Sequence, residues 1–222
     1  MNQGLMPAGW GASAGLIAGF GDRSFSIDPS LVVRVRQVHG AAIARADTLQ
    51  RGIVHDIAAD ALVATQPGVV AAVATADCVP ILLLDPATRW TAAVHSGWRG
   101  TLAGIVSRAV AAATDFGVAP TRLLAAIGPS IGGCCYEVGE DIAEQFAAVG
   151  MPVRRALDRS KPALDLRECN EHLLRSVGLP PSRIQVCGPC TRCRSDLYHS
   201  YRAHRDAAGR QLSWIGWADR SP

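Results

Sequence analysis

Apolar residues alternate with polar ones in one segment and form continuous runs in several others. In 31–38, Val33 and Val35 alternate with Arg34 and Arg36, which is typical of a half-buried strand. Uninterrupted apolar runs predict strands covered on both faces at 69–75, 79–84 and 91–95. Further apolar runs predict strands at 123–127, 184–187 and 214–217.

Helical spacing begins soon after the 91–95 run. Between 101 and 116, apolar residues recur every three or four positions, and Gly117 is suitably placed to end a helix. Segments 138–149 and 166–177 predict two more helices. The Gly- and Ala-rich segment 1–20 is expected to be partly loose, and 152–162 to be a loop. Interspersed helices and strands predict an α+β fold, an α/β sandwich of mixed sheets layered with helices, as one domain over residues 1–222.

Composition narrows the class of protein. The 222 residues are 49% hydrophobic, which excludes disorder, and carry a net charge of only +3 with 5% aromatic residues. Neither figure favours nucleic-acid binding. The uncharged stretch 1–21 is broken by Pro7 and several glycines, and no basic segment precedes it, so we expect neither a membrane span nor a secretory signal. We expect a cytoplasmic protein, where seven cysteines would bind metal, react or lie buried.

Three potential metal ligands lie next to predicted strands: His39, Cys78 and His95. Imidazole nitrogen and thiolate sulfur are donors that Zn²⁺ prefers, and three protein ligands leave one position open for a water whose pKa falls to about 7. The spacing fits no short zinc signature, so the residues are equally compatible with two unrelated histidines and a buried cysteine. In another interpretation, Cys78 is a nucleophile with His95 as its base.

Two Gly-rich loops precede predicted helices. Gly97 and Arg99 follow His95, where backbone N–H groups and a guanidinium fork are suited to a phosphate. An ordinary turn with Arg99 in a surface ion pair is the alternative. The second loop, 128–137, contains Gly132 and is able to line a pocket with backbone donors.

A run of cysteines near the C-terminal end has metal-binding spacing. Cys187, Cys190 and Cys193 form a C-x2-C-x2-C pattern, which suggests an iron–sulfur or structural zinc site if Cys169 or a distant histidine supplies the fourth ligand. The remaining histidines lie in polar or mixed surroundings and are expected to be solvated: His55, His172, His199 and His204.

Taken in order, several motifs resemble one known family. QVHG, ADALV, TADCVP, AVHSGWRG, IGPSIGGCCYEVG, CTRC and SYRAHRD are similar to motifs of the laccase-domain, or multicopper polyphenol oxidase, proteins over about residues 18–217. Bacterial members of that family are described as purine nucleoside phosphorylases with adenosine deaminase activity, and related members as peptidoglycan-editing factors. Only residues 24–36 separate Arg23 from QVHG, so the N-terminal region is shortened relative to the family.

The resemblance implies roles for individual residues. It implies a zinc site of His39, Cys78 and His95, and a mixed-sheet α+β sandwich. Asp77 corresponds to the acid beside the cysteine, where it would orient a ligand. The phosphate- or substrate-binding residues that we expect are Arg23, Gly97, Arg99, Gly132 and Tyr201. Cys78, Asp77 and Arg99 are the expected catalytic residues, and Asp77 and Tyr201 are candidate donors to a departing purine.

The resulting function hypothesis is a zinc-dependent purine nucleoside enzyme. Its partners would be phosphate and a nucleoside, with phosphorolysis of adenosine, inosine or methylthioadenosine, and deamination of adenosine. We expect zinc rather than copper, because six scattered histidines without an H-x-H pair fit a multicopper cluster poorly. The alternatives are a copper polyphenol oxidase, a metal-free Cys–His amidase or deamidase acting on peptide-like or cell-wall precursors, and a non-catalytic nucleoside-binding protein.

Overall fold

The protein was analysed as a computed structural model that describes residues 4–155 and 160–219. Its strands are β1 Leu16–Phe20, β2 Arg34–Arg36, β3 Ile43–Arg45, β4 Val54–Ala58, β5 Ala61–Ala64, β6 Val70–Thr75, β7 Val79–Asp85, β8 Trp90–Ser96, β9 Leu124–Ile127, β10 Ile184–Val186 and β11 Gln211–Trp217. Its α-helices are α1 Trp98–Leu102, α2 Ile105–Asp115, α3 Glu140–Ala148, α4 Leu166–Ser176 and α5 Tyr201–His204.

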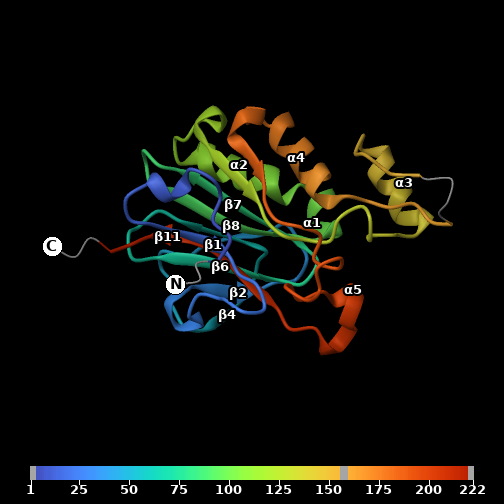
Figure 1. Ribbon diagram of the computed structural model, residues 1–222. Helices are drawn as coiled ribbons and strands as arrows, with labels where there is room; N and C mark the ends of the chain where they lie inside the picture. The colour runs from blue at the N-terminus through green and yellow to red at the C-terminus, as the bar shows by residue number, and fades with distance from the viewer. Residues whose placement is uncertain (1–3, 156–159, 220–222) are drawn as a thin grey trace.

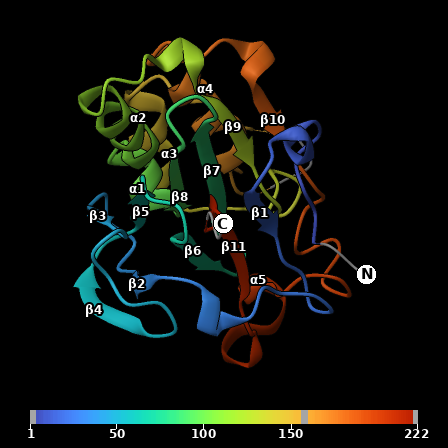
Figure 2. The same ribbon diagram turned by 90° about the vertical axis from the view of Figure 1, so that its left-hand side faces the viewer.

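The elements stack in layers (Figure 1). A mixed sheet in the order β10-β9-β7-β8-β5-β3 lies at the centre, with α2 and α4 over one face. An antiparallel sheet in the order β1-β11-β6 covers the other face, and the small β2–β4 sheet lies below it (Figures 1 and 2). The predicted α+β sandwich of mixed sheets layered with helices is therefore confirmed.

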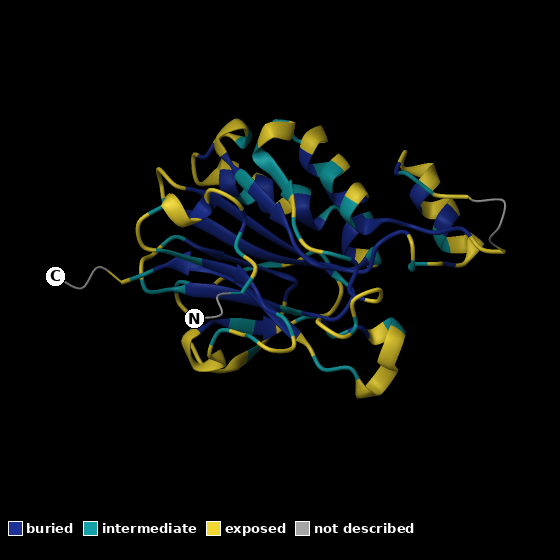
Figure 3. Ribbon diagram, viewed as in Figure 1, coloured by how far each residue is buried: buried dark blue, intermediate teal, exposed yellow. Residues whose placement is uncertain are grey.

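Strand β7 explains why the central runs are apolar without a break. Its odd-numbered residues, such as Ile81 and Leu83, pack against the helices, whereas Leu82 and Leu84 pack against the β1–β11–β6 sheet. Both faces are thus removed from water, as the buried strands and the inward sides of the helices in Figure 3 show. A strand covered on both sides carries no alternating pattern, because neither face needs polar side chains.

The predicted elements are found with shifted ends. The helix expected over 101–116 is split, because Gly104 adopts a left-handed φ of 70° between α1 and α2. The strand expected over 31–38 shortens to β2, after a 3-10 turn at Pro29–Leu31. Part of 1–20, expected to be loose, is strand β1, which pairs with β11. Its Gly and Ala content hid it from the hydrophobic pattern.

The sequence pattern missed some elements, and some of its expectations stay untested. The sequence pattern did not predict β3, β4 and β5. The loop expected over 152–162 includes 156–159, which lie outside the described residues, and the single domain over 1–222 stays a prediction. Within 4–155 and 160–219, no helix combines the length and apolar character needed to cross a membrane.

Candidate functional site

The three expected ligands come together at one edge of the central sheet. Cys78 immediately precedes β7, and His95 is the penultimate residue of β8. The antiparallel register places Pro80 opposite His95. Cys78 lies two residues before Pro80, which brings it beside that imidazole. His39 follows β2, and its ring centroid lies 4.8 Å from that of His95, edge to face. One donor atom from each of the three residues lies within 4.8 Å of the other two.

A buried carboxylate fixes two of these ligands. Asp60 is fully buried, and its Oδ1 accepts hydrogen bonds from His95 Nδ1 at 2.8 Å and from the His39 backbone N–H at 2.9 Å. Its Oδ2 accepts from the backbone N–H of Gly40 at 2.7 Å. A proton on Nδ1 leaves His95 Nε2 as the donor atom for a metal. Asp60 thus orients one imidazole and shapes the loop that carries the other.

The backbone is strained beside the ligands. His39 and Asp77, the residue before Cys78, both have a left-handed φ, of 60° and 84° respectively. Non-glycine residues seldom adopt this conformation unless the surroundings enforce it, and such residues cluster at functional sites. Two of them next to one cluster support a functional role for it.

The three side chains also alter each other's protonation. Burial alone raises the pKa of the Cys78 thiol, but hydrogen bonds and charge from His39 and His95 outweigh it and lower that pKa to about 6. Burial lowers the pKa of His95, yet its hydrogen bonds to Asp60 and Cys78 raise that pKa to about 9. At neutral pH the pair without metal is therefore thiolate and imidazolium.

The cluster opens into a cavity of about 660 Å³. His95 is buried and His39 is exposed, so the ligands are reached from the cavity side. Arg99, Arg202, Arg205 and Arg210 also line the cavity. Three of these stack on aromatic rings of the same cavity: Arg99 on Trp98 at 4.2 Å, Arg202 on Tyr136 at 5.3 Å and Arg205 on Tyr201 at 5.7 Å from the ring centroid.

Those guanidinium groups give the cavity a positive charge. Within the described ranges, no acidic side chain forms an ion pair with any of the four. Stacking on an aromatic ring holds a guanidinium in place. Arg202 Nη2 donates to the Glu137 carbonyl, and Arg210 Nη1 donates to the carbonyls of Ala208 and Gly209, but a guanidinium has five N–H donors and so keeps others for a ligand. The cavity lining therefore combines the donor trio His39, Cys78 and His95 with four arginines suited to an anionic group. These four, Arg99, Arg202, Arg205 and Arg210, are called the arginine rim below.

Comparison with known proteins identifies the family. The family profile described as "Multi-copper polyphenol oxidoreductase laccase" matches residues 22–218. The chain belongs to this laccase family. A purine nucleoside phosphorylase of Deinococcus radiodurans is 40% identical over 185 residues, which is 82% of this chain and 69% of that protein. An adenosine deaminase, RL5, from an unknown prokaryotic organism is 33% identical over 85% of this chain and 76% of its own.

Solved structures agree with the fold. YlmD from Geobacillus stearothermophilus superposes with a TM-score of 0.86 at 29% identity, over 99% of this chain and 98% of that one. The hypothetical protein YfiH of Bacillus licheniformis gives a TM-score of 0.76 at 30% identity, over 86% of this chain and 75% of that one.

In this laccase-family chain, two segments distant in sequence hold the Asp77 carboxylate, one residue before Cys78. Its Oδ1 accepts a hydrogen bond from Thr191 Oγ1 at 2.7 Å, and its Oδ2 accepts one from the backbone N–H of Arg202 at 2.6 Å. The expected orienting role belongs to Asp60, whose carboxylate reaches His95 directly. Because Asp77 directly precedes Cys78, these two hydrogen bonds anchor the backbone next to Cys78 to two distant segments. The sequence analysis missed Asp60, whose only local feature is that it is a single acid beside the apolar residues 61–64.

The expected substrate-binding residues divide into two groups. Arg99 and Tyr201 line the cavity, and Gly97 abuts the ligands, since an added Cβ there would lie 3.1 Å from Cys78 Sγ. Arg23 does not line the cavity, and its Nη1 donates to the Ser195 carbonyl at 3.4 Å. Gly132 also lies outside the lining, and its N–H donates to Cys190 Sγ. Neither Arg23 nor Gly132 is therefore placed to bind a ligand in this cavity.

The cysteines that cluster in the structure differ from those expected from the C-x2-C-x2-C pattern. Cys190 and Cys193 lie close to Cys134 and Cys135, not to Cys187 or Cys169. The Cys187 N–H continues the pairing of β10 with β9 by donating to the Ile127 carbonyl at 2.7 Å. The Cys169 thiol instead donates to the Pro152 carbonyl, at 4.0 Å. Sequence spacing alone favoured Cys187 because the partner loop is more than fifty residues away.

Proposed function

We propose that this chain is a zinc-dependent purine nucleoside enzyme of the cytoplasm, with Cys78 and Arg99 among its catalytic residues. It would cleave adenosine, inosine or methylthioadenosine with phosphate and would also deaminate adenosine. The observation that carries the proposal is the convergence of His39, Cys78 and His95 on the floor of an arginine-rimmed cavity. Relatives named purine nucleoside phosphorylase and adenosine deaminase support the substrate class.

The donor set fits a zinc ion. Two imidazoles and one thiolate match the ligands that zinc prefers, and the Asp60 contact to His95 is the usual arrangement behind a metal-bound histidine. When bound with three protein ligands, such an ion acts as a Lewis acid and lowers the pKa of a water molecule. The chain's part is to hold His39, Cys78 and His95 in one orientation.

The arginine rim would bind the phosphate nucleophile. Phosphate must approach the ribose as a charged group, and several guanidiniums at the cavity wall would bind it and hold it in position to attack. Arg99 lies on α1, directly after the His95 loop, so it would position phosphate close to the donor trio.

A neutral phenol in the cavity would serve the purine. Burial, and then the charge of Cys78, raise the pKa of Tyr136 to about 12, so the hydroxyl stays protonated at neutral pH. It would donate a hydrogen bond to a purine nitrogen as the base departs. Both Asp77 oxygens accept hydrogen bonds from the protein, so Asp77 would not be that donor. Its catalytic contribution would be to position Cys78.

The test combines product detection with metal analysis. Purified protein should convert adenosine or inosine plus phosphate to free base and ribose phosphate, with zinc present, and Cys78→Ala should lose at least about a hundredfold in kcat/KM. Cys187→Ala, a half-buried thiol outside the cavity, is the matched control. Equal turnover by Cys78→Ala and by the unmodified protein would overturn the proposal.

One observation favours a second candidate, a metal-free Cys–His amidase or deamidase. The low pKa of Cys78 beside His95 is also what a thiolate nucleophile requires. Alkylation separates the two functions, because a nucleophilic thiolate reacts in the protein as purified, whereas a metal-bound sulfur is protected until a chelator is added.

A further inference from the structure

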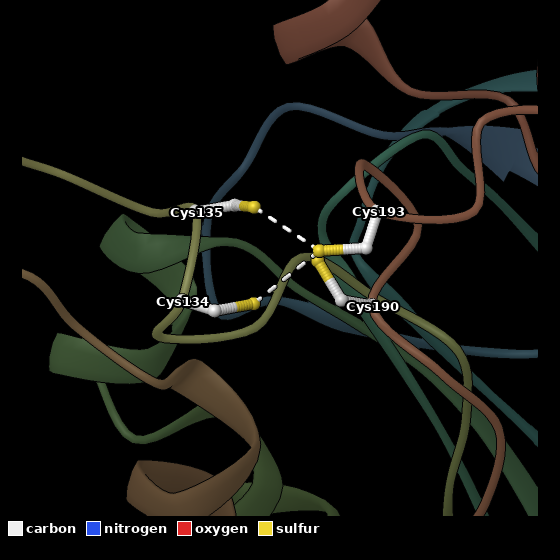
Figure 4. Close-up of side chains that lie close together, drawn as sticks. All are labelled: Cys134, Cys135, Cys190 and Cys193. Atoms are coloured by element: carbon white, nitrogen blue, oxygen red, sulfur yellow. Dashed lines mark hydrogen bonds between the residues drawn. The ribbon is translucent and has the colours of Figure 1, made fainter.

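A second group of sulfur donors lies outside the cavity floor. Cys134 and Cys135 lie in the turn that follows β9, and Cys190 and Cys193 lie in the turns that follow β10. The four Sγ atoms lie within 4.8 Å of one another (Figure 4). The Sγ of Cys193 is 3.6 Å from that of Cys134 and 3.4 Å from that of Cys135.

This spacing matches a single tetrahedral ion. A zinc–sulfur bond of about 2.3 Å implies sulfur–sulfur separations of about 3.8 Å around the metal, close to the two distances above. A cluster with several irons would spread its thiolates over different metal atoms and so place them farther apart. Figure 4 shows all four side chains directed toward one another from two separate segments.

Two hydrogen-bond donors contact the sulfur atoms of the cluster. The Gly132 N–H donates to Cys190 Sγ at 3.3 Å. The guanidinium of Arg192 bonds to Cys135, and its positive charge would offset part of the negative charge of four thiolates. Gly132 packs directly against the cluster, because an added Cβ there would lie 3.4 Å from Cys134 Sγ and 3.5 Å from Cys190 Cβ.

We propose that Cys134, Cys135, Cys190 and Cys193 bind one zinc ion at a structural site, separate from the His39–Cys78–His95 trio. All four ligands come from the protein, which leaves no open position and assigns this ion a structural role.

The site would hold two walls of the cavity together. Tyr136, which lines the cavity, follows Cys135 directly, and Thr191, which donates to Asp77, follows Cys190 directly. Between the two segments, the described links next to the cysteines include the Ser130–Cys190 bridge, in which the Thr191 N–H donates to the Ser130 carbonyl at 3.0 Å, and the hydrogen bond from the Gly132 N–H to Cys190 Sγ. A metal bridge would therefore fix the position of Tyr136 relative to Asp77 more firmly than these hydrogen bonds do.

Metal stoichiometry tests the proposal. Protein purified under reducing conditions should hold two zinc ions per chain, and Cys193→Ser should hold one. Cys187→Ser should keep both, because Cys187 lies outside the cluster. Cys78→Ser should lose the other ion and keep this one, so failure of the proposed enzyme activity would be distinguishable from failure of the structural site. Equal zinc in Cys193→Ser and in the unmodified protein would overturn the proposal.

A measurement without substitutions covers the case in which Cys193→Ser fails to fold. X-ray absorption at the zinc edge of the unmodified protein should show more sulfur than nitrogen neighbours. A sulfur share no higher than that of a two-histidine, one-cysteine site would contradict the four-cysteine site. Iron in place of zinc, or a mass lower by two hydrogens from a Cys135–Cys193 disulfide, would do the same.

Discussion

At the scale of single residues, the Asp60 carboxylate joins two of the three donor residues. It accepts hydrogen bonds from His95 Nδ1 and from the backbone N–H groups of Val38, His39 and Gly40. These contacts lower its pKa although burial alone raises it, so the carboxylate stays ionised. A negative charge behind His95 raises the basicity of that ligand.

Replacement of Asp60 by asparagine should weaken metal binding. An amide would turn a donor toward backbone N–H groups and leave a buried group unsatisfied. We expect zinc affinity at the trio to fall by about 10- to 100-fold, measured by competition with a chromophoric chelator. Asp56→Asn is the control, because Asp56 is exposed and pairs only with Arg36. Equal affinities in the two folded variants would show that Asp60 does not support the trio.

The protonation of Cys78 should be visible in its reactivity. Its pKa is lowered from 9.0 to about 6, so the thiolate forms as pH rises through about 6 and persists above it. In zinc-free protein, iodoacetamide labelling of Cys78, followed by peptide mass spectrometry, should therefore have its midpoint near pH 6. Burial raises the pKa of Cys187, which should label only at higher pH. A Cys78 midpoint near the ordinary thiol value of about 8.5 would contradict the assigned environment.

Adding zinc should suppress that labelling. A metal-bound sulfur has its lone pair engaged, so Cys78 should become protected in the same pH range while Cys187 keeps its own profile. Undiminished labelling of Cys78 with zinc present would favour the thiol nucleophile over the metal site.

At the scale of elements, the loop after β9 determines how closely two sheets pack. The loop after β9 begins at Gly128, whose added Cβ would overlap the ring of Phe20, a fully buried residue of β1. Gly128 thus lets the β9 end of the central sheet pack directly against the neighbouring sheet. The same loop continues to Tyr136 at the cavity.

Gly128→Ala should destabilise the fold. The added methyl group overlaps the Phe20 ring and Pro80 Cγ, so we expect a loss of about 1–3 kcal/mol in the free energy of unfolding, measured by urea denaturation. Gly11→Ala is the control, since its added Cβ would meet only Met6 Sδ at 3.5 Å, and it should change stability by less than about 0.5 kcal/mol. Equal stabilities would mean that the two sheets separate easily at this point.

The sequence predicted elements where local pattern sufficed and failed where pairing decided. Continuous apolar runs predicted β6, β7 and β8 well, because burial on both faces leaves a local record. Strand β1, with sequence LIAGF, is specified by its pairing with β11 almost two hundred residues later. Helical spacing continued through Gly104, but that glycine adopts a left-handed φ of 70°, which the spacing of apolar residues does not reveal.

The site residues also divide into those that the sequence predicted and those that it missed. His39, Cys78 and His95 were predicted from chemistry and resemblance, and the register of β7 with β8 brings the last two together. Asp60 was missed because one acid in an apolar segment has no pattern to distinguish it. The four-cysteine cluster was missed because its two halves come from distant turns, and local spacing favoured Cys187 instead.

At the scale of the whole molecule, positive charge is concentrated at the cavity. The chain has 22 basic and 19 acidic residues, a small excess, yet four arginines without acidic partners among the described residues line one cavity. Elsewhere several arginines pair with acids, as Arg155 does with Glu140 at 2.7 Å. The net charge therefore hides a local field that would attract small anions.

Phosphate alone should therefore stabilise the zinc-loaded protein. Binding to the folded state raises Tm in proportion to RT ln(1 + [L]/Kd), so Tm should rise with phosphate and the rise should shrink as sodium chloride screens the arginines. Arg205→Ala combined with Arg210→Ala should reduce the shift at a given phosphate concentration by more than half. Arg108→Ala, an exposed arginine on α2 outside the cavity, should keep it. An equal phosphate shift in both proteins would place the anion elsewhere and remove the support that the arginine rim gives to phosphorolysis.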